Sequence, residues 1–199
     1  MATSLAECPS VYKSWAGALP YGRRNMKKPI IGFVGPSGAG KSTLIAELVH
    51  HLSDRLSIIK SLTTRQRREI ADDLFYQFVT LEELHKREAE GRLIQVSEYA
   101  GNLYANDAVD LDKLLDSKCG LMAIVEEGVD HFRSKGYAVI TIHIIPQDNP
   151  AQTDMLRKTA DEERKKVPML FDLEIVNSFK EGGKEEALRK IIDFVHRIA

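Results

Sequence analysis

The sequence has few cysteines and no excess of charge of either sign. Its 2 cysteines, Cys8 and Cys119, are too few for a disulfide framework, and no pair of cysteines or histidines has the spacing of a zinc site. This cysteine usage is typical of a reducing compartment, so we expect a cytoplasmic protein. The net charge of −1 gives no overall electrostatic basis for binding nucleic acid or an acidic membrane surface.

Long hydrophobic runs are missing as well. The apolar stretches fall far short of the roughly 20 residues that a membrane-spanning helix needs. Residues 1–28 lack the continuous apolar segment of a secretory signal and are expected to form a loosely ordered extension. The length of 199 residues suits one domain with a sizeable core. We therefore expect a soluble protein without nucleic-acid or membrane partners, as a monomer or a homodimer.

What the sequence does contain, from residue 29 to residue 199, is an alternation of β-rich runs and amphipathic helical stretches. This alternation predicts an α/β fold with a parallel sheet flanked by helices. Strands are expected at 30–34, 56–59, 121–125, 137–145 and 173–176, and helices at 43–52 and 185–198. Between 61 and 106 the pattern changes to a strand near 75–79, a helix at 81–91 and a hairpin-like pair at 93–104. We expect a core of 29–60 and 107–199, with 61–106 as an insertion at the edge of the sheet.

The strongest local motif lies between the first expected strand and the first expected helix. Residues 35–42 match the phosphate-loop pattern GxxxxGK[ST], in which backbone N–H groups and the helix N-terminus face phosphate oxygens. The residues expected to bind ATP here are Gly35, Pro36, Ser37, Gly38, Ala39, Gly40, Lys41, Ser42 and Thr43. Lys41 would bridge the β- and γ-phosphates, and the Ser42 hydroxyl would hold Mg²⁺. The strand-loop-helix context disfavours the alternative, a glycine-rich turn without a ligand.

A second basic cluster follows the second expected strand. Arg65, Arg67 and Arg68 fall within four residues of an expected exposed turn. A guanidinium bonds two phosphate oxygens at once, so the cluster could neutralise a second phosphate group. Taken alone it would more simply be a solvated basic turn, but its position beside a phosphate loop favours the second phosphate site.

Together these motifs resemble those of guanylate kinases, over most of the chain. The segments that carry the resemblance are 35–44, 61–68, 72–79, 101–104 and 175–177. The resemblance implies a P-loop NTPase-type sheet, a small mixed NMP-binding insertion at 61–106 and a short lid at about 147–166. It also implies transfer of the γ-phosphoryl group of Mg-ATP to GMP or dGMP, which gives ADP and GDP.

The resemblance also assigns roles by position. Arg65 and Arg68 would grip the GMP phosphate and act with Lys41 in catalysis. The whole set expected to bind GMP is Ser61, Arg65, Arg68, Tyr76, Gln95, Tyr104 and Asn106, and Asn177 joins the ATP-binding set. Each tyrosine taken alone could equally be an ordinary half-buried aromatic residue of a strand.

The chain departs from the family pattern around the guanine base. Gln95 stands where a glutamate is usual, and an amide offers guanine one acceptor and one donor group where a carboxylate offers two acceptors. Ala123 and Val125 stand where acids are usual, and Asn106 replaces a serine. The neighbouring acids of residues 126 and 127 either substitute for the missing ones or favour a helix N-terminus. We therefore expect base discrimination to be weaker or changed.

The expected lid is also unusual, because residues 147–154 contain no arginine. Arg157 and Arg164, on the helix expected next, either stabilise the transferring phosphoryl group or belong to the solvated face of that helix. The favoured function is an ATP-dependent nucleoside monophosphate kinase acting on GMP. A nucleotide kinase with altered acceptor specificity and a non-catalytic binding module of the same family remain the alternatives.

Overall fold

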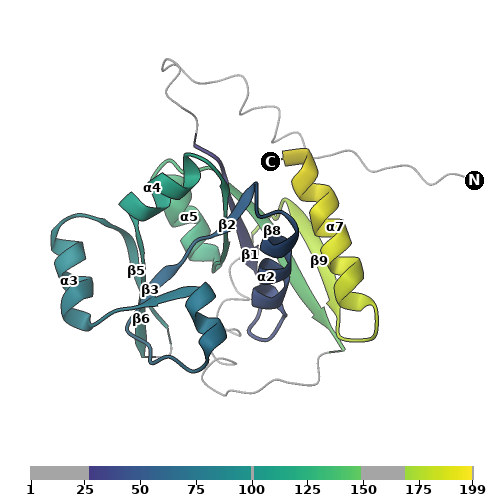
Figure 1. Cartoon of the computed structure of the whole chain (residues 1–199), viewed down its shortest axis with the longest axis horizontal. Coiled ribbons are helices and arrows are strands. Elements are labelled where there is room, and N and C mark those ends of the chain that lie inside the picture. The colour runs from purple at the N-terminus through teal and green to yellow at the C-terminus, as the bar shows by residue number, and fades with distance from the viewer. Residues whose placement is uncertain (1–26, 100, 149–168, 199) are drawn as a thin grey trace, which may run out of the picture.

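A computed structural model describes residues 27–99, 101–148 and 169–198 (Figure 1). Most of the expected extension and of the expected lid lie outside these ranges, and so do Arg157 and Arg164. Within the described ranges, none of the helices combines the length and the apolar character needed for a membrane crossing.

The core of the molecule is a parallel sheet of five strands, which confirms the expected fold class. The strands are β1 (Ile30–Val34), β2 (Leu56–Ile58), β7 (Cys119–Ala123), β8 (Val139–Gln147) and β9 (Leu173–Ser178), in the order β2-β7-β1-β8-β9. Every pairing between neighbours is parallel. The central strand β1 is buried along its whole length, because helices cover both faces of the sheet and leave no polar side.

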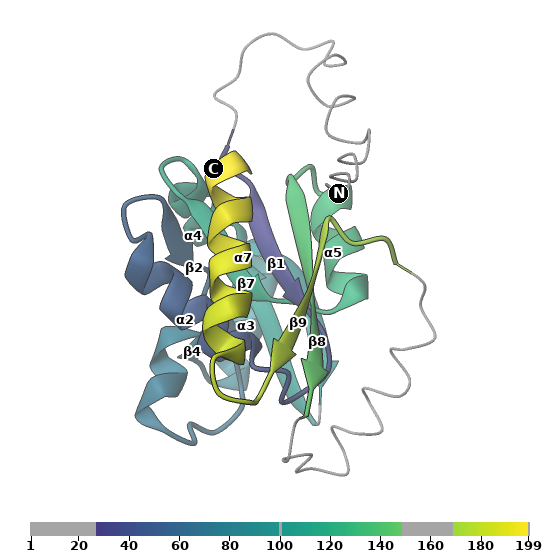
Figure 2. The ribbon, with the colours of Figure 1, turned by 90° about the vertical axis from the view of Figure 1, so that its right-hand side faces the viewer.

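Four amphipathic helices supply these covering layers. On one face, α2 (Lys41–His51) and α7 (Gly183–Ile198) pack into one hydrophobic cluster with the strands, and Figure 2 shows α7 beside β9. On the other face, α4 (Ala108–Leu115) and α5 (Glu126–Ser134) contribute to a second cluster. Since the helices connect successive parallel strands, the carboxyl ends of the strands and the loops after them gather at one edge.

The segment between residues 61 and 107 forms a second sheet of its own. Its elements are β3 (Ser61–Thr63), the 3-10 helix η1 (Ile70–Leu74), β4 (Tyr76–Phe78), α3 (Leu81–Ala89), β5 (Leu93–Tyr99) and β6 (Asn102–Asp107), with strand order β4-β3-β6-β5. The expected hairpin is present as β5 and β6, and Gly101 takes the positive φ of +72° that its tight turn requires. Leu62, Leu84 and Ala105 form a small separate core between this sheet and α3.

Several expected boundaries were wrong. No strand was expected at Ser61–Thr63, but these residues form β3, because they pair with β4 on one side and with β6 on the other. The strand expected at 121–125 lies two residues earlier, since Val125 is the N-cap of α5. Strands β8 and β9 each extend two residues beyond the expected end, where their last residues pair with each other. These errors reflect pairings with distant strands, which local composition does not encode.

Candidate nucleotide site

The phosphate loop connects β1 to α2, as the sequence predicts, and two of its glycines are required by their surroundings. Gly35 has φ +147°, and a Cβ atom there would lie 2.5 Å from the carbonyl oxygen of Ile144. Gly40 has φ +86°, and a Cβ atom there would lie 2.4 Å from Nδ2 of Asn177. Any side chain at either position would collide with the strands behind the loop, so the tight curl of the backbone depends on glycine.

The beginning of α2 is arranged as an anion site. Its N-cap residue is Gly40, which has no side chain to satisfy the first N–H groups of the helix. The first turn contains no acidic residue that would repel a phosphate. Ser42 and Thr43 are exposed on this turn, which leaves their hydroxyl groups accessible beside the loop. The helix dipole and the N–H groups therefore face the same exposed region.

Lys41 folds back over the loop from the first position of α2. Its Nζ atom donates hydrogen bonds to the carbonyl oxygens of Gly35 and Pro36, both at 2.7 Å. These bonds hold the ammonium group at the loop, where a bound phosphate chain would meet it. The remaining loop residues, Ser37, Gly38 and Ala39, complete the curve between these two contacts.

Asn177, near the end of β9, connects the edge of the sheet to the loop. It is 5% exposed, and its Nδ2 atom donates to the carbonyl oxygen of Ala39 at 2.9 Å. Its Oδ1 atom is buried and, among the described residues, accepts no hydrogen bond. An unpaired buried acceptor is costly, which marks this position beside the loop as a candidate part of the site.

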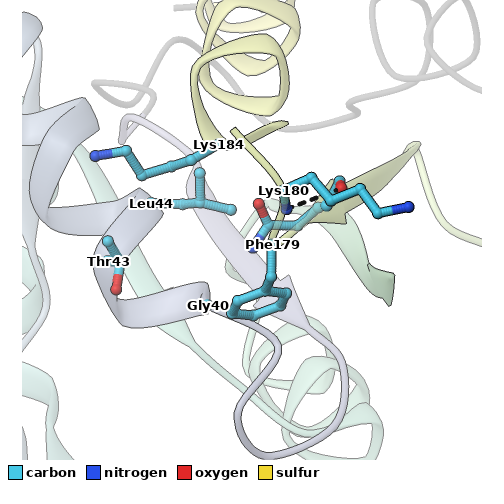
Figure 3. A pocket seen from close by; sticks show the side chains of 8 residues that line it. Gly40, Thr43, Leu44, Phe179, Lys180 and Lys184 are labelled. Atoms are coloured by element: carbon cyan, nitrogen blue, oxygen red, sulfur yellow. Dashed lines mark hydrogen bonds between the residues drawn. The ribbon is translucent and has the colours of Figure 1, made fainter. Parts of the chain in front are cut away.

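Beside Asn177 lies a cavity of about 170 Å³ (Figure 3). It is lined by residues from α2, the end of β9 and α7: Gly40, Thr43, Leu44, Asn177, Ser178, Phe179, Lys180 and Lys184. Figure 3 shows the Phe179 ring beside Gly40. The sequence motifs identified Gly40, Thr43 and Asn177 but missed the other lining residues, although three of them follow Asn177 directly.

The second basic cluster differs from the exposed turn that we expected. Arg65 is only 7% exposed: its NH2 atom lies 3.0 Å from Oδ1 of Asp72, and its guanidinium group stacks over the Tyr76 ring at 4.8 Å. Arg67 is exposed and paired with Asp73. Arg68 is exposed, and within the described residues its side chain has no ion-pair partner. The three arginines therefore differ in environment: Arg67 and Arg68 have the expected exposed position, whereas Arg65 is buried.

The ion pair of Arg65 and Asp72 holds both groups in their charged forms. Burial opposes the charge on Arg65, but the hydrogen bond and charge of Asp72 outweigh it and raise the pKa of Arg65. Burial also opposes ionisation of Asp72, but hydrogen bonds from Arg65 and from the backbone N–H of Arg68 lower the pKa of Asp72 below its ordinary value. The sequence motifs included Asp72 without giving it a role, because this contact depends on the 3-10 turn of η1.

Most of the residues expected to bind GMP lie on one face of the second sheet. Ser61 pairs in register with Tyr76, and Thr63 pairs with Tyr104, so these side chains point away from the Leu62 and Ala105 core. The Tyr76 and Tyr104 rings are 6.0 Å apart, and Asn106 Nδ2 donates to the Ser61 hydroxyl at 3.3 Å. Burial is the main cause of the raised pKa of Tyr76, which keeps its phenol neutral.

The residues that depart from the family pattern lie where the second sheet meets the core. Gln95, on β5, approaches α5 so closely that its Oε1 atom is 3.7 Å from a Cβ placed on Gly128. Ala123 ends β7 and is exposed, and Val125 is the N-cap of α5. Glu126 and Glu127 occupy the first turn of α5, the position that favours acids near a helix N-terminus.

The fold and the glycine loop define a protein with a P-loop NTPase-type fold, with a second basic region in the sheet of residues 61–107. A family model described as "Guanylate kinase" matches residues 26–175. The chain therefore belongs to the guanylate kinase family.

Individual relatives agree with this assignment. The chain is 28% identical to the guanylate kinase of Mycoplasmoides gallisepticum over 171 residues, which cover 85% of this chain and 84% of that protein. It is 33% identical to the guanylate kinase of Sus scrofa, covering 75% of this chain and 84% of that one. The crystal structure of guanylate kinase from Anaplasma phagocytophilum matches with a TM-score of 0.63 at 23% identity over 87% of each chain, which shows the same fold.

Proposed function

We propose that this protein is an ATP-dependent guanylate kinase, which transfers the γ-phosphoryl group of ATP to GMP or dGMP and releases ADP and GDP. The observation that carries the proposal is the pairing of two phosphate-handling regions in one chain of this family. The glycine loop lies at the end of β1, and Arg65 and Arg68 follow β3 of the second sheet, where Arg65 stacks over the Tyr76 ring. Transfer between two anions requires both to be held and their repulsion cancelled, and this chain has basic groups for each.

The donor side of the reaction is performed by the loop and α2. The N–H groups of residues 35–43 bind the phosphate chain of ATP, and Lys41 exchanges its bonds to Gly35 and Pro36 for phosphate oxygens. Asn177 supports the loop by donating to the Ala39 carbonyl oxygen, and it borders the cavity in which the nucleotide would lie.

A magnesium ion fits the chemistry of this site. The Ser42 hydroxyl is exposed at the start of α2, and Mg²⁺ at nucleotide sites keeps several waters and takes other ligands from phosphates. Within the described residues there is no cluster of three His, Cys, Asp or Glu side chains that could hold a metal alone. Ser42 and the phosphates would hold the ion, which neutralises charge on the β- and γ-phosphates when bound.

The acceptor side is performed by the second sheet. Arg65 and Arg68 bind the GMP phosphate, supported by the phenol groups of Tyr76 and Tyr104, while Ser61, Gln95 and Asn106 contact the base. Arg157 and Arg164 are the proposed stabilisers of the transferring phosphoryl group.

We also propose that the protein acts in the cytoplasm on small-molecule nucleotides, as a monomer or a homodimer, with residues 1–28 outside the kinase domain.

A coupled assay of ADP release tests this proposal. The protein is supplied with Mg-ATP and, in separate reactions, with GMP, dGMP, AMP, CMP or UMP. We expect GMP and dGMP to give the highest kcat/KM, and EDTA to abolish turnover until Mg²⁺ is restored. Turnover with no monophosphate, or a preference for AMP, CMP or UMP, would contradict the proposal.

A further inference from the structure

Asp72 contacts both arginines of the acceptor phosphate region, each through a different oxygen. Its Oδ1 atom lies 3.0 Å from NH2 of Arg65, and its Oδ2 atom accepts from the backbone N–H of Arg68 at 3.0 Å. The same oxygen lies 3.4 Å from the backbone N–H of Glu69. One carboxylate therefore fixes the guanidinium group of Arg65 and the backbone that carries Arg68.

The surroundings of Asp72 make it an anchor rather than a mobile competitor for the phosphate. Its side chain is only 14% exposed, and two backbone N–H groups hold it in place. The Arg65 side chain is confined in turn by Asp72, by the Gln66 carbonyl oxygen at 3.3 Å and by the Tyr76 ring. Among the described residues, the polar contacts of the Arg65 side chain to Asp72 and to the Gln66 carbonyl oxygen use two of the five N–H donors of its guanidinium group.

We propose that Asp72 is a positioning residue, which orients Arg65 and Arg68 so that together they bind the phosphate of the acceptor nucleotide. This inference rests on the proposed function, because it takes that phosphate as the ligand of the two arginines. Asp72 itself does not touch the nucleotide. The negative charge of Asp72 weakens the attraction of this region for the phosphate. The contact with Asp72 nevertheless prevents the Arg65 side chain from adopting other orientations. A pre-oriented pair of donors binds the phosphate more tightly.

The adjacent pair supplies a matched control. Arg67 and Asp73 form an ion pair of the same two residue types. Arg67 lies two residues after Arg65, and Asp73 directly follows Asp72. Unlike Arg65 and Asp72, their side chains are about half exposed, at 48% and 50%. Such an exposed pair contributes little to stability or orientation. Substitution of Asp73 by Asn changes the same charge in the same turn without removing a contact to Arg65.

The test compares the full-length variants D72N, D73N and D72E by calorimetric binding of GMP and, separately, of ATP. For D72N we expect about tenfold weaker GMP binding, the effect of losing one charge-assisted hydrogen bond, with unchanged ATP binding. D73N should match the wild type, and D72E should bind GMP more tightly than D72N because it keeps the charge. In turnover, D72N should raise the KM for GMP more than it lowers kcat, and leave the KM for ATP unchanged.

Three results would overturn the inference: GMP binding by D72N equal to that of D73N, tighter GMP binding by D72N, or an equal loss of ATP and GMP binding. An equal loss would mean that the substitution disturbs the whole fold. A different result would contradict the proposed function: the wild type binds GMP but transfers no phosphoryl group to it. In that case the comparison of GMP binding among the variants still decides the role of Asp72. A wild type that binds no GMP would contradict both.

Discussion

At the scale of single residues, the polar side chains of the site are held by bonds within the protein. Lys41 is bound to two loop carbonyl oxygens, Asn177 to a third, and Arg65 to Asp72. Side chains held in this way lose little further freedom when a nucleotide binds, which lowers the entropic cost of binding. The motif spacing predicts Lys41, and the family resemblance predicts Asn177. Neither could show that Arg65 is buried, because its partner lies seven residues away across a 3-10 turn.

The ion pair of Asp72 predicts a pH dependence of stability. Its pKa in the folded protein is below the ordinary value of 3.8, so the stabilisation is complete above that value and is lost as the pH falls through the folded pKa. We expect the wild type to exceed D72N in free energy of unfolding by roughly 2 kcal/mol at pH 7. Urea denaturation at a series of pH values should show this difference shrinking below the ordinary pKa. A difference that stays constant down to pH 2 would contradict the assignment.

Lys41 predicts a large effect on chemistry. Replacing it with Ala removes the charge placed over the phosphate loop, so we expect kcat to fall by about a hundredfold or more, as when a preorganised donor to a developing charge is removed. Lys190→Ala serves as the control, because Lys190 lies on the surface of α7 and pairs with Glu186. Steady-state turnover of both variants with ATP and GMP checks the prediction. Similar rates for the two variants would show that Lys41 has no part in the transfer.

At the scale of elements, the phosphate loop depends on β9 as well as on its own sequence. The side chain of Asn177 fills the space beside Gly40, so the end of the last strand fixes the curve of the loop after the first. The loop, its strand and its helix could be predicted from the sequence because the motif is local. The positions of Phe179 and Lys184 in the lining of the cavity could not be predicted, since they depend on where β9 and α7 pack against α2.

Gly40→Ala tests this dependence. The new Cβ would lie 2.4 Å from Asn177 Nδ2, so the substitution combines the strain of a positive φ with a collision. Gly91→Ala is the matched control, because Gly91 has φ +68° with no atom within 4 Å of the new Cβ, and strain alone costs about 1 kcal/mol. We expect ATP to raise the thermal midpoint of G91A but not that of G40A. An equal rise in both variants would contradict the role of this contact.

The junction between the second sheet and the core is formed by Asp107. Its side chain, 2% exposed, accepts from the Val109 N–H at the start of α4 and pairs with Arg92 at 2.6 Å and with Arg87 at 3.4 Å. Asp107→Ala would leave both arginines without this carboxylate and α4 without its cap, so we expect a loss of about 3 kcal/mol in free energy of unfolding. Asp116→Ala, at an exposed pair with Lys27, should cost far less. Urea denaturation compares them, and equal losses would contradict the prediction.

At the scale of the whole molecule, the chain forms two sheets with different proposed roles. The main sheet supplies the phosphate loop, and the second sheet presents the residues proposed for the acceptor. The main sheet could be predicted because its strands are buried apolar runs with helices between them. The pairing within the second sheet could not, because β3 and β4 have three residues each and pair in parallel across the η1 turn.

The departures at Gln95, Ala123 and Val125 also matter at this scale. Gln95 lies beside α5, Ala123 pairs in register with Phe33, two residues before the phosphate loop, and Val125 is the N-cap of α5. Under the proposed function they bear on the choice of base, whereas Lys41, Arg65 and Arg68, which are proposed to bind phosphate, are present among the described residues. On this account the chain remains a kinase of its family even where the surroundings of the base have changed.

The most direct test of this account is a ³¹P NMR time course of the wild-type protein with Mg-ATP and GMP. The account predicts that the γ-phosphate signal of ATP declines while the signals of ADP and of the β-phosphate of GDP rise in equal amounts, and that omitting GMP stops the change. Formation of ADP with free inorganic phosphate in place of GDP, or no change at all, would contradict it.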